Sequence, residues 1–453
     1  MQHNSEQSDK ATEGFPTWLN SQRFLARRVA RPTHRFMQIE ASGGIALLAA
    51  TALALIWVNS PWSDSYMRLW DTSISFGVGD HVLTHDLVHW VNDGLMVLFF
   101  FVVGLEIKKE LVVGRLSSIR EASLPVVAAI GGMIVPALIY FAFNAGTPGA
   151  RGWGIPMATD IAFAVGVMAL LGSRVPGPLK VMLLALAIVD DIGAIVVIAI
   201  FYTEKITWSW LVVALFGLAA VMVMQRAKVW YVPAYVVVGL IVWFATFQSG
   251  IHATIAGVAL GLLTPARPLL SASGVSRIAT EVSLDEDLTV DEIRDASFEL
   301  RESVSVAERL QELLHPWTSF VIIPMFALAN AGIVISGDVL STALGSRVTI
   351  GIILGLVVGK FVGITGASTL AVKLGIARLP EGVTLPQVGG MSMVAGIGFT
   401  VSLFISGLAF TDELLDAEAK IGILVASAIA ALLGVIALRT ILSGEAVEEP
   451  TGQ

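Results

Sequence analysis

The chain has 453 residues, of which 55% are hydrophobic and 14% are charged, and its formal net charge is −8. Because an ordinary soluble domain has about 25% charged residues, this composition argues against a soluble fold and indicates a membrane domain. The acidic excess lies mainly in segments 281–312 and 411–418, and it gives no reason to expect binding to nucleic acid. The absence of cysteine excludes disulfides, thiolate catalysis and cysteine-ligated metals.

Polar segments divide the chain. We expect residues 1–36 to form a basic cytoplasmic tail, residues 37–440 a membrane domain, and residues 441–453 a second cytoplasmic tail. Segment 270–312, rich in Ser, Asp and Glu, is predicted to be a solvated and partly disordered cytoplasmic insertion, although its spacing would also allow some helix. The first apolar run follows too much polar sequence for an ordinary secretory signal, so we interpret it as a retained helix.

Apolar runs of about 17 to 25 residues, long enough to cross a bilayer, recur along the chain. They predict an all-α polytopic protein with twelve spans, which begin near Gly44, Val88, Leu124, Gly154, Pro178, Trp208, Val232, His252, Pro316, Val348, Val388 and Ile421. If both termini are cytoplasmic, the inner segments hold 22 of the 28 Lys and Arg residues, as the positive-inside rule requires. Residues 73–84 alternate apolar and polar side chains around Gly77 to Asp80, which predicts a short β-hairpin on the outer face.

Ionisable residues within apolar helices are costly, so each one is a candidate functional residue. They are few here: Asp93, Asp160, Asp190, Asp191 and Lys360, with His252 as a polar neighbour. Glu106 and Glu110 lie at the inner end of the second span, where long side chains can also reach water and act as interfacial anchors.

Asp190 and Asp191 stand midway along an otherwise apolar helix. Helical neighbours point about 100° apart, so the two carboxylates cannot serve one ligand equally. Lys360, the only mid-span lysine, is the expected partner of one of them. A salt bridge that only joins helices would explain one aspartate but not the other, and the second aspartate is therefore the better ligand candidate.

A buried carboxyl group beside a like charge favours its neutral form, so it can hold either a proton or a small cation such as Na⁺. If the same group faces each side of the membrane in turn, exchange of the cation for a proton follows at a single site.

Two spans are interrupted in the middle. In GWGIPMATDIAFAVG, Pro156 and the polar pair Thr159-Asp160 break the fourth span. In GGMSMVAGIGFTVSLF, Gly396 and Gly398 weaken the eleventh, although helix packing alone would also explain those glycines. Such paired interruptions predict an inverted-repeat transporter with its site at the bilayer midplane. We expect Asp160 to offset the positive helix ends at this crossing and Lys360 the negative ends.

Several segments together closely resemble the NhaA-type sodium/proton antiporters from about residue 37 to residue 440. They are ASGGIALLAA, VNDGLMVLFFFVVGLEIKKEL, GWGIPMATDIAFAVG, LALAIVDDIGAIVVIAIFYT, SGIHATIAGV, LHPWTSFVIIPMFALANAG and GIGFTVSLFISGLAF. The resemblance implies a secondary transporter without a cofactor, which exchanges Na⁺ or Li⁺ for protons by alternating access. It implies an electrogenic, pH-regulated exchange in the bacterial inner membrane that serves pH and sodium homeostasis.

The resemblance also assigns roles to residues. It implies that Asp191 is the principal ligand for Na⁺ and the proton, that Asp190 pairs with Lys360, and that Thr159 and Asp160 sit at the helix crossing. It further implies a homodimer joined through the 73–84 hairpin.

A pH response is implied at a second group of residues. The resemblance places Glu106 and Glu110 near a cytoplasmic funnel, gives Asp93 a supporting role and links His252 to pH, although His252 can equally be a packed, hydrogen-bonded histidine. Shortly before LHPW, where the family commonly has an acidic residue, the chain reads Gln311-Glu312, so we expect a shifted pH threshold.

Two other classes compete with an antiporter. Paired aspartates could serve an intramembrane aspartyl protease, but its Gly-x-Gly-Asp element matches only Gly77 to Asp80, in the outer connector. Acidic side chains could also line a passive cation channel. The broken spans favour a transporter over both.

Overall fold

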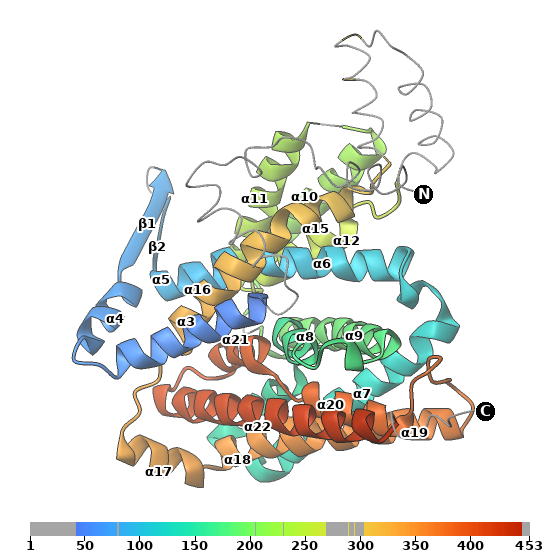
Figure 1. Cartoon of the computed structure of the whole chain (residues 1–453). Coiled ribbons are helices and arrows are strands. Elements are labelled where there is room, and N and C mark those ends of the chain that lie inside the picture. Colours follow the sequence, from blue (N-terminus) through green and yellow to red (C-terminus); the bar gives the residue numbers. More distant parts are fainter. Residues whose placement is uncertain are drawn as a thin grey trace, which may run out of the picture.

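The computed structural model describes residues 42–78, 81–203, 205–229, 231–268, 289, 294 and 303–445. The basic tail 1–36, nearly all of segment 270–302 and residues 446–453 lie outside these residues, so the predictions made for them stay untested. The described chain is mostly helical, with one two-stranded sheet among the described residues (Figure 1).

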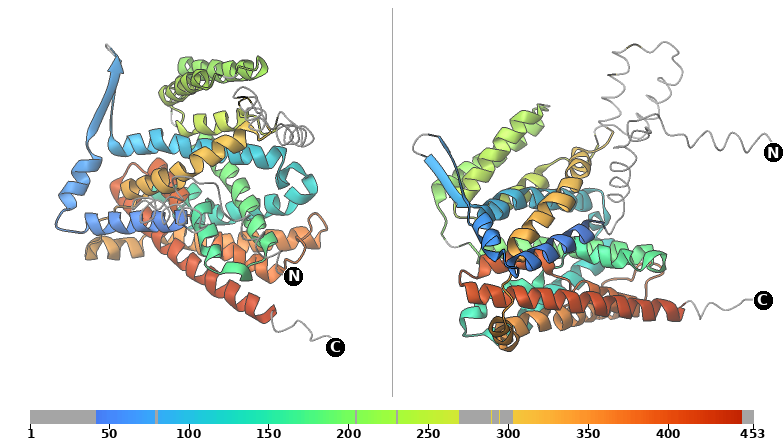
Figure 2. Two further views of the ribbon diagram at one scale, coloured as in Figure 1. Left: turned by 45° about the horizontal axis from the view of Figure 1, so that its top comes forward. Right: turned by 60° about the vertical axis from the view of Figure 1, so that its left-hand side comes forward.

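The first half of the chain contains the strands and the first broken span. Its elements are α3 (Ser42–Val58), α4 (Ser63–Trp70), β1 (Ser73–Val78), β2 (His81–Asp86), α5 (Leu87–His89), the π-helix η3 (Trp90–Leu95), α6 (Met96–Val112), η4 (Arg115–Ser117), α7 (Ile119–Asn144), the 3₁₀-helix η5 (Pro148–Met157), α8 (Ile161–Ala169), η6 (Gly172–Arg174) and α9 (Gly177–Phe201). The strands pair antiparallel, with Ser73 opposite Asp86, and project away from the helices (Figure 2).

The regular elements described in the second half of the chain are all helices. Its elements are α10 (Trp208–Arg226), α11 (Val232–Gln248), α12 (Thr254–Leu263), α15 (Val306–Trp317), the π-helix η7 (Thr318–Ile322), α16 (Ile323–Asn330), α17 (Gly337–Gly345), α18 (Arg347–Leu354), the π-helix η8 (Gly355–Gly359), α19 (Lys360–Lys373), α20 (Leu385–Val394), α21 (Phe399–Ala409) and α22 (Glu413–Glu445).

Two of these helices begin well before the positions that the sequence suggested. α15 begins at Val306 rather than near Pro316, because the Ser305 side chain accepts a hydrogen bond from the Glu308 amide and caps the helix. α22 begins at Glu413 rather than near Ile421. The side chain of Asp412, the preceding residue, accepts hydrogen bonds from two of the first amides of the helix. Polar caps thus extend both helices beyond their apolar runs.

Among the described residues, six helices are long and apolar enough to cross a membrane. Three bent helix pairs would raise that number to nine: α3 with α4 at 116°, η5 with α8 at 47°, and α20 with α21 at 51°. Two shorter apolar helices, α11 and α12, are present as well. The chain is therefore a helical multi-pass membrane protein, whereas the number twelve and the inverted repeats stay predictions.

Glycine residues lie where α7 approaches α19 and where α6 approaches α12. α7 packs along α19, where a Cβ atom at Gly131 would overlap the Gly363 carbonyl oxygen, and one at Gly363 would overlap that of Gly131. α6 approaches α12 in the same way at Gly104 and Gly261. Small residues let helix backbones come close in a membrane, where no hydrophobic effect drives helices together. α10 and α11 lie together at one edge of the molecule, and α22 runs along the opposite edge (Figures 1 and 2).

Candidate functional site

The two interrupted helices meet at their breaks. Residues 158–160 separate η5 from α8, and residues 395–398 separate α20 from α21. The Asp160 amide donates to the Ile397 carbonyl oxygen at 2.7 Å, and the Thr159 hydroxyl donates to the Ala395 carbonyl oxygen at 2.8 Å. Backbone groups that each break leaves without a helical partner are therefore bonded across the crossing.

Proline and glycine residues allow the two breaks to come this close. Pro156 lies at the end of η5 and has no amide hydrogen to donate, and the chain is extended at Ala158 and Asp160. A Cβ atom at Gly396 would come within 2.5 Å of the Leu356 carbonyl oxygen, and one at Gly398 within 3.1 Å of the Ala158 carbonyl oxygen. A side chain at position 396 would therefore force the backbone apart, and one at position 398 would require a small shift.

Asp160 caps two helices at once. Its Oδ1 accepts from the Phe163 amide of α8 at 2.9 Å. Its Oδ2 accepts from the Thr400 amide at 3.0 Å and from the Thr400 hydroxyl at 2.5 Å, at the start of α21. The carboxylate thus faces the positive ends of two helix dipoles, where we expected Asp160 to lie. The partner Thr400 was not among the predicted site residues, although a hydroxyl residue two positions after Gly398 was a usable signal.

Lys360 is the first residue of α19 and follows the π-helix η8. Its side chain is 0% exposed, and Nζ donates to Asp190 Oδ2 at 2.5 Å and to Thr159 Oγ1 at 3.0 Å. Since Thr159 in turn donates to Ala395 at the end of α20, Lys360 reaches that negative helix end through a hydroxyl rather than directly. Thr159 therefore connects the ion pair to the crossing.

Of the aspartates Asp160, Asp190 and Asp191, Asp191 is the one that takes part in none of these hydrogen bonds. It is 5% exposed, against 1% for Asp190, and it has no hydrogen bond or ion pair with any described residue. Three carboxylates interact with it electrostatically, those of Asp190, Glu106 and Asp160, and the Lys360 ammonium group opposes them without a direct contact. A buried carboxylate without a partner is costly unless a proton or a cation neutralises it.

The described residues contain no group of three or more His, Cys, Asp or Glu side chains suited to a metal ion. A hard cation that visited this site would therefore depend on Asp191 together with other oxygen atoms, such as hydroxyl, carbonyl and water oxygens.

Glu106 and Glu110, predicted near an inner funnel, lie one turn apart on α6 and interact electrostatically. Glu106 is half-buried on α6, whereas Glu110 accepts from the Arg115 amide at 3.0 Å. Glu312 is exposed on α15 and makes no hydrogen bond or ion pair with the described residues. α6 and α15 are instead joined by Lys109 and Glu308, whose charged atoms are 2.8 Å apart. This ion pair was not among the predicted contacts, because its two residues lie far apart in the sequence.

His252 and Asp93 lie apart from the crossing. A ring nitrogen of His252 lies 3.0 Å from the Tyr202 carbonyl oxygen, so this histidine is hydrogen-bonded. Asp93 belongs to η3, and its carbonyl oxygen accepts from the Trp243 indole at 2.7 Å. The two residues are near enough to interact electrostatically, but neither has a hydrogen bond to the crossing.

Comparison with known proteins gives a consistent result. Residues 34–438 match the family described as Na⁺/H⁺ antiporter 1. The chain is 50% identical over 415 residues to a protein of Rhodopirellula baltica named Na(+)/H(+) antiporter NhaA, covering 90% of this chain and 93% of that one. It is 47% identical over 435 residues to a protein of the same name from Oleidesulfovibrio alaskensis, covering 93% and 96%.

Proposed function

Since the chain belongs to the Na⁺/H⁺ antiporter 1 family, we propose that it is a secondary transporter that exchanges Na⁺ or Li⁺ for protons at a buried aspartate. The observation that carries this proposal is Asp191, a nearly buried carboxylate with no partner among the described residues. It lies beside the Asp190–Lys360 pair, where two broken helices meet. The established relatives are named sodium/proton antiporters, which selects Na⁺ among small cations.

Charge neutrality at this site provides the coupling. Lys360 offsets the charge of Asp190, and two helix ends offset that of Asp160. Asp191 has no direct contact with a positive group, because Lys360 attracts it electrostatically but is hydrogen-bonded to Asp190. The lowest-energy states of the site therefore hold one proton or one Na⁺ but not both. Entry of Na⁺ therefore expels the proton, and entry of a proton expels Na⁺.

Exchange also requires that the site open to one side of the membrane at a time. The breaks at residues 158–160 and 395–398 support such a motion, because they join the half-helices through a few hydrogen bonds rather than through continuous helix. We propose that the half-helices move around Asp191. Because exchange of one proton for one Na⁺ at Asp191 alone would be electroneutral, we further propose that the buried pair of Asp190 and Lys360 releases an additional proton, so that more protons than sodium ions move in each cycle. A membrane potential would then drive the exchange, with about 2.3 kcal/mol per net charge for each 100 mV.

The wider organisation belongs to the same proposal. It comprises twelve spans with inverted repeats, both termini in the cytoplasm of a bacterial cell and the domain boundaries 37 and 440. It also comprises a homodimer joined through β1 and β2. The pair of strands projects from the helices and so could reach a second copy (Figure 2). We also propose that pH regulates the activity. The residues involved are Glu106, Glu110, Asp93, His252 and Glu312.

The test uses the purified full-length protein in sealed vesicles with an imposed pH gradient, to which Na⁺, Li⁺ or K⁺ is added separately. We expect Na⁺ and Li⁺ to dissipate the gradient and K⁺ to leave it intact. Asp191→Asn should abolish the response, because an amide cannot exchange a proton for a cation. Asp71→Asn, at an exposed aspartate after α4, is the matched control and should retain it.

Two results would contradict the proposal. Full exchange by Asp191→Asn would remove the site assignment. Passage of Na⁺ without any proton movement would indicate a passive channel, in which acidic groups select cations without alternating access.

A further inference from the structure

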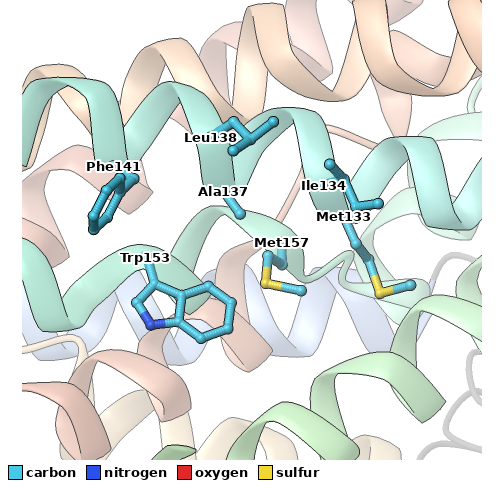
Figure 3. A pocket seen from close by; sticks show the side chains of 7 residues that line it. All are labelled: Met133, Ile134, Ala137, Leu138, Phe141, Trp153 and Met157. Atoms are coloured by element: carbon cyan, nitrogen blue, oxygen red, sulfur yellow. The ribbon is translucent and has the colours of Figure 1, made fainter.

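An apolar groove of about 330 Å³ opens between α7 and η5, away from the hydrogen bonds of the crossing. Figure 3 shows the side chains that line it; they are Met133, Ile134, Ala137, Leu138, Phe141, Trp153 and Met157. None of them is charged. Ile134, Leu138 and Phe141 are exposed by 52%, 62% and 50%, so the groove is open on one side.

The groove lies on the outward face of α7. The opposite face carries Gly132 and Pro136, which are buried against α19 and η8. The apolar surface continues from the groove onto α9, where Phe201 is 57% exposed and meets the Trp153 ring edge-to-face at 5.1 Å. In a multi-pass membrane protein, such a surface faces the hydrocarbon of the bilayer.

We infer that this groove binds one acyl chain of a bilayer phospholipid. Its volume is about twice that of the ~150 Å³ cavities that admit benzene, and it is at the lower end of the ~300–1,000 Å³ range of small-molecule sites. An extended polypeptide segment would bring backbone N–H and C=O groups, which the lining could not satisfy because it offers little beyond one indole N–H. An acyl chain has no such groups. A transmembrane helix satisfies its own backbone, but with a diameter of about 10–12 Å it is too wide for a groove of this volume.

Two lining residues, Met133 and Met157, connect the groove to segments that carry the ion site, so a bound chain bears on transport; this step rests on the proposed function. A Cβ atom at Gly193 would overlap the Met133 sulfur, which therefore packs directly on α9 two residues from Asp191. Met157 is 6% exposed and lies two residues before Thr159. An acyl chain between Met133 and Met157 thus holds α7 and η5 at a fixed spacing beside the crossing.

Fluorescence quenching tests the occupant directly. Wild-type protein and Trp153→Phe are reconstituted in vesicles of dioleoylphosphatidylcholine and in vesicles whose lipid chains carry bromine at mid-chain. The difference between the two proteins isolates the emission of Trp153, which we expect the brominated chains to quench. Ala137→Phe fills the groove and should protect Trp153. Ala219→Phe, at a half-buried alanine of α10, is the matched control and should leave the quenching unchanged.

Equal quenching of Trp153 in Ala137→Phe and Ala219→Phe would overturn the inference. If Ala137→Phe does not fold, Ala137→Leu carries the same comparison with less added volume. Proton exchange is measured on the same vesicles as lipid chain length is varied, and its dependence on chain length should be lost in Ala137→Phe but kept in Ala219→Phe. A wild type that shows quenching without any exchange would refute the proposed function and leave the acyl-chain site intact.

Discussion

Replacement of Lys360 by methionine should destabilise the protein more than the loss of any surface ion pair. Methionine retains a long apolar side chain but removes the charge, so Asp190 is left at 1% exposure without its counter-ion. Its Oδ1 atom already lacks a hydrogen-bond partner. Removing one member of a buried pair typically costs about 3–5 kcal/mol, because the remaining charge stays buried.

The same reasoning predicts that a second substitution restores stability. In Lys360→Met combined with Asp190→Val, both charges are replaced by apolar groups, and such exchanges are often neutral or stabilising by about 1–4 kcal/mol. The double variant should therefore be more stable than Lys360→Met alone. It should not transport, because Asp190 and Lys360 are both part of the proposed site.

The assay is reversible unfolding of the purified protein in mixed micelles of a mild and a denaturing detergent, from which the free energy of unfolding is obtained. Lys109→Met is the control, since Lys109 and Glu308 form an ion pair that is 36% and 47% exposed. Exposed pairs contribute about 0–1 kcal/mol. A cost for Lys360→Met no greater than that for Lys109→Met, or no recovery in the double variant, would refute the assignment of a buried ion pair.

Three further predictions concern the crossing, the glycine contact and the hairpin. Thr400→Val removes the hydroxyl that donates to Asp160 and should cost about 1.5–3 kcal/mol, typical of a hydrogen bond to a charged group, with slower exchange in the vesicle assay. Gly363→Ala should force α7 from α19 and lower the unfolding temperature, whereas Gly366→Ala, where a Cβ meets nothing within 4 Å, should not. Burial opposes ionisation of Asp86, but hydrogen bonds from His89 hold its pKa below the usual value. Its contribution to local stability is therefore present above pH ~4 and lost as pH falls further. Protection of the amides at the start of α5, measured as exchange relative to the intrinsic rate at each pH, should fall below that pH in the wild type but not in Asp86→Ala. These ideas fail, respectively, if Thr400→Val is neutral, if both glycine variants behave alike, or if the protection does not change with pH.

The sequence was most informative where a polar residue interrupts an apolar helix. Asp190, Asp191 and Lys360 could be selected as candidates because charge is rare inside a span, and Pro156 marked a break because proline cannot donate a backbone hydrogen bond. Each of these signals is local. None depends on the relative orientation of two helices.

Features that depend on helix orientation or on capping were harder to predict. The helical angle between Asp190 and Asp191 does not say which of them faces Lys360, because the rotation of α9 is set by its packing. Pro316 looked like a helix start, yet it lies within a continuous helical segment next to the π-helix η7, which rearranges the backbone hydrogen bonds locally. Tertiary contacts therefore decide what the pattern alone leaves open.

Thr159 contacts both the Asp190–Lys360 ion pair and the point where the two broken helices cross. Its hydroxyl accepts from Lys360 and donates to the Ala395 carbonyl oxygen, so one oxygen atom joins the ion pair to the end of α20. A cation at Asp191 would repel the Lys360 ammonium group and weaken the contact between that group and Thr159. The hydrogen bond to Ala395 would then be the remaining tie at this point, and a shift of α20 would no longer disturb the ion pair. We therefore propose that binding at Asp191 and movement of the half-helices are coupled through this hydroxyl, which Thr159→Val would remove while leaving both carboxylates and the lysine in place.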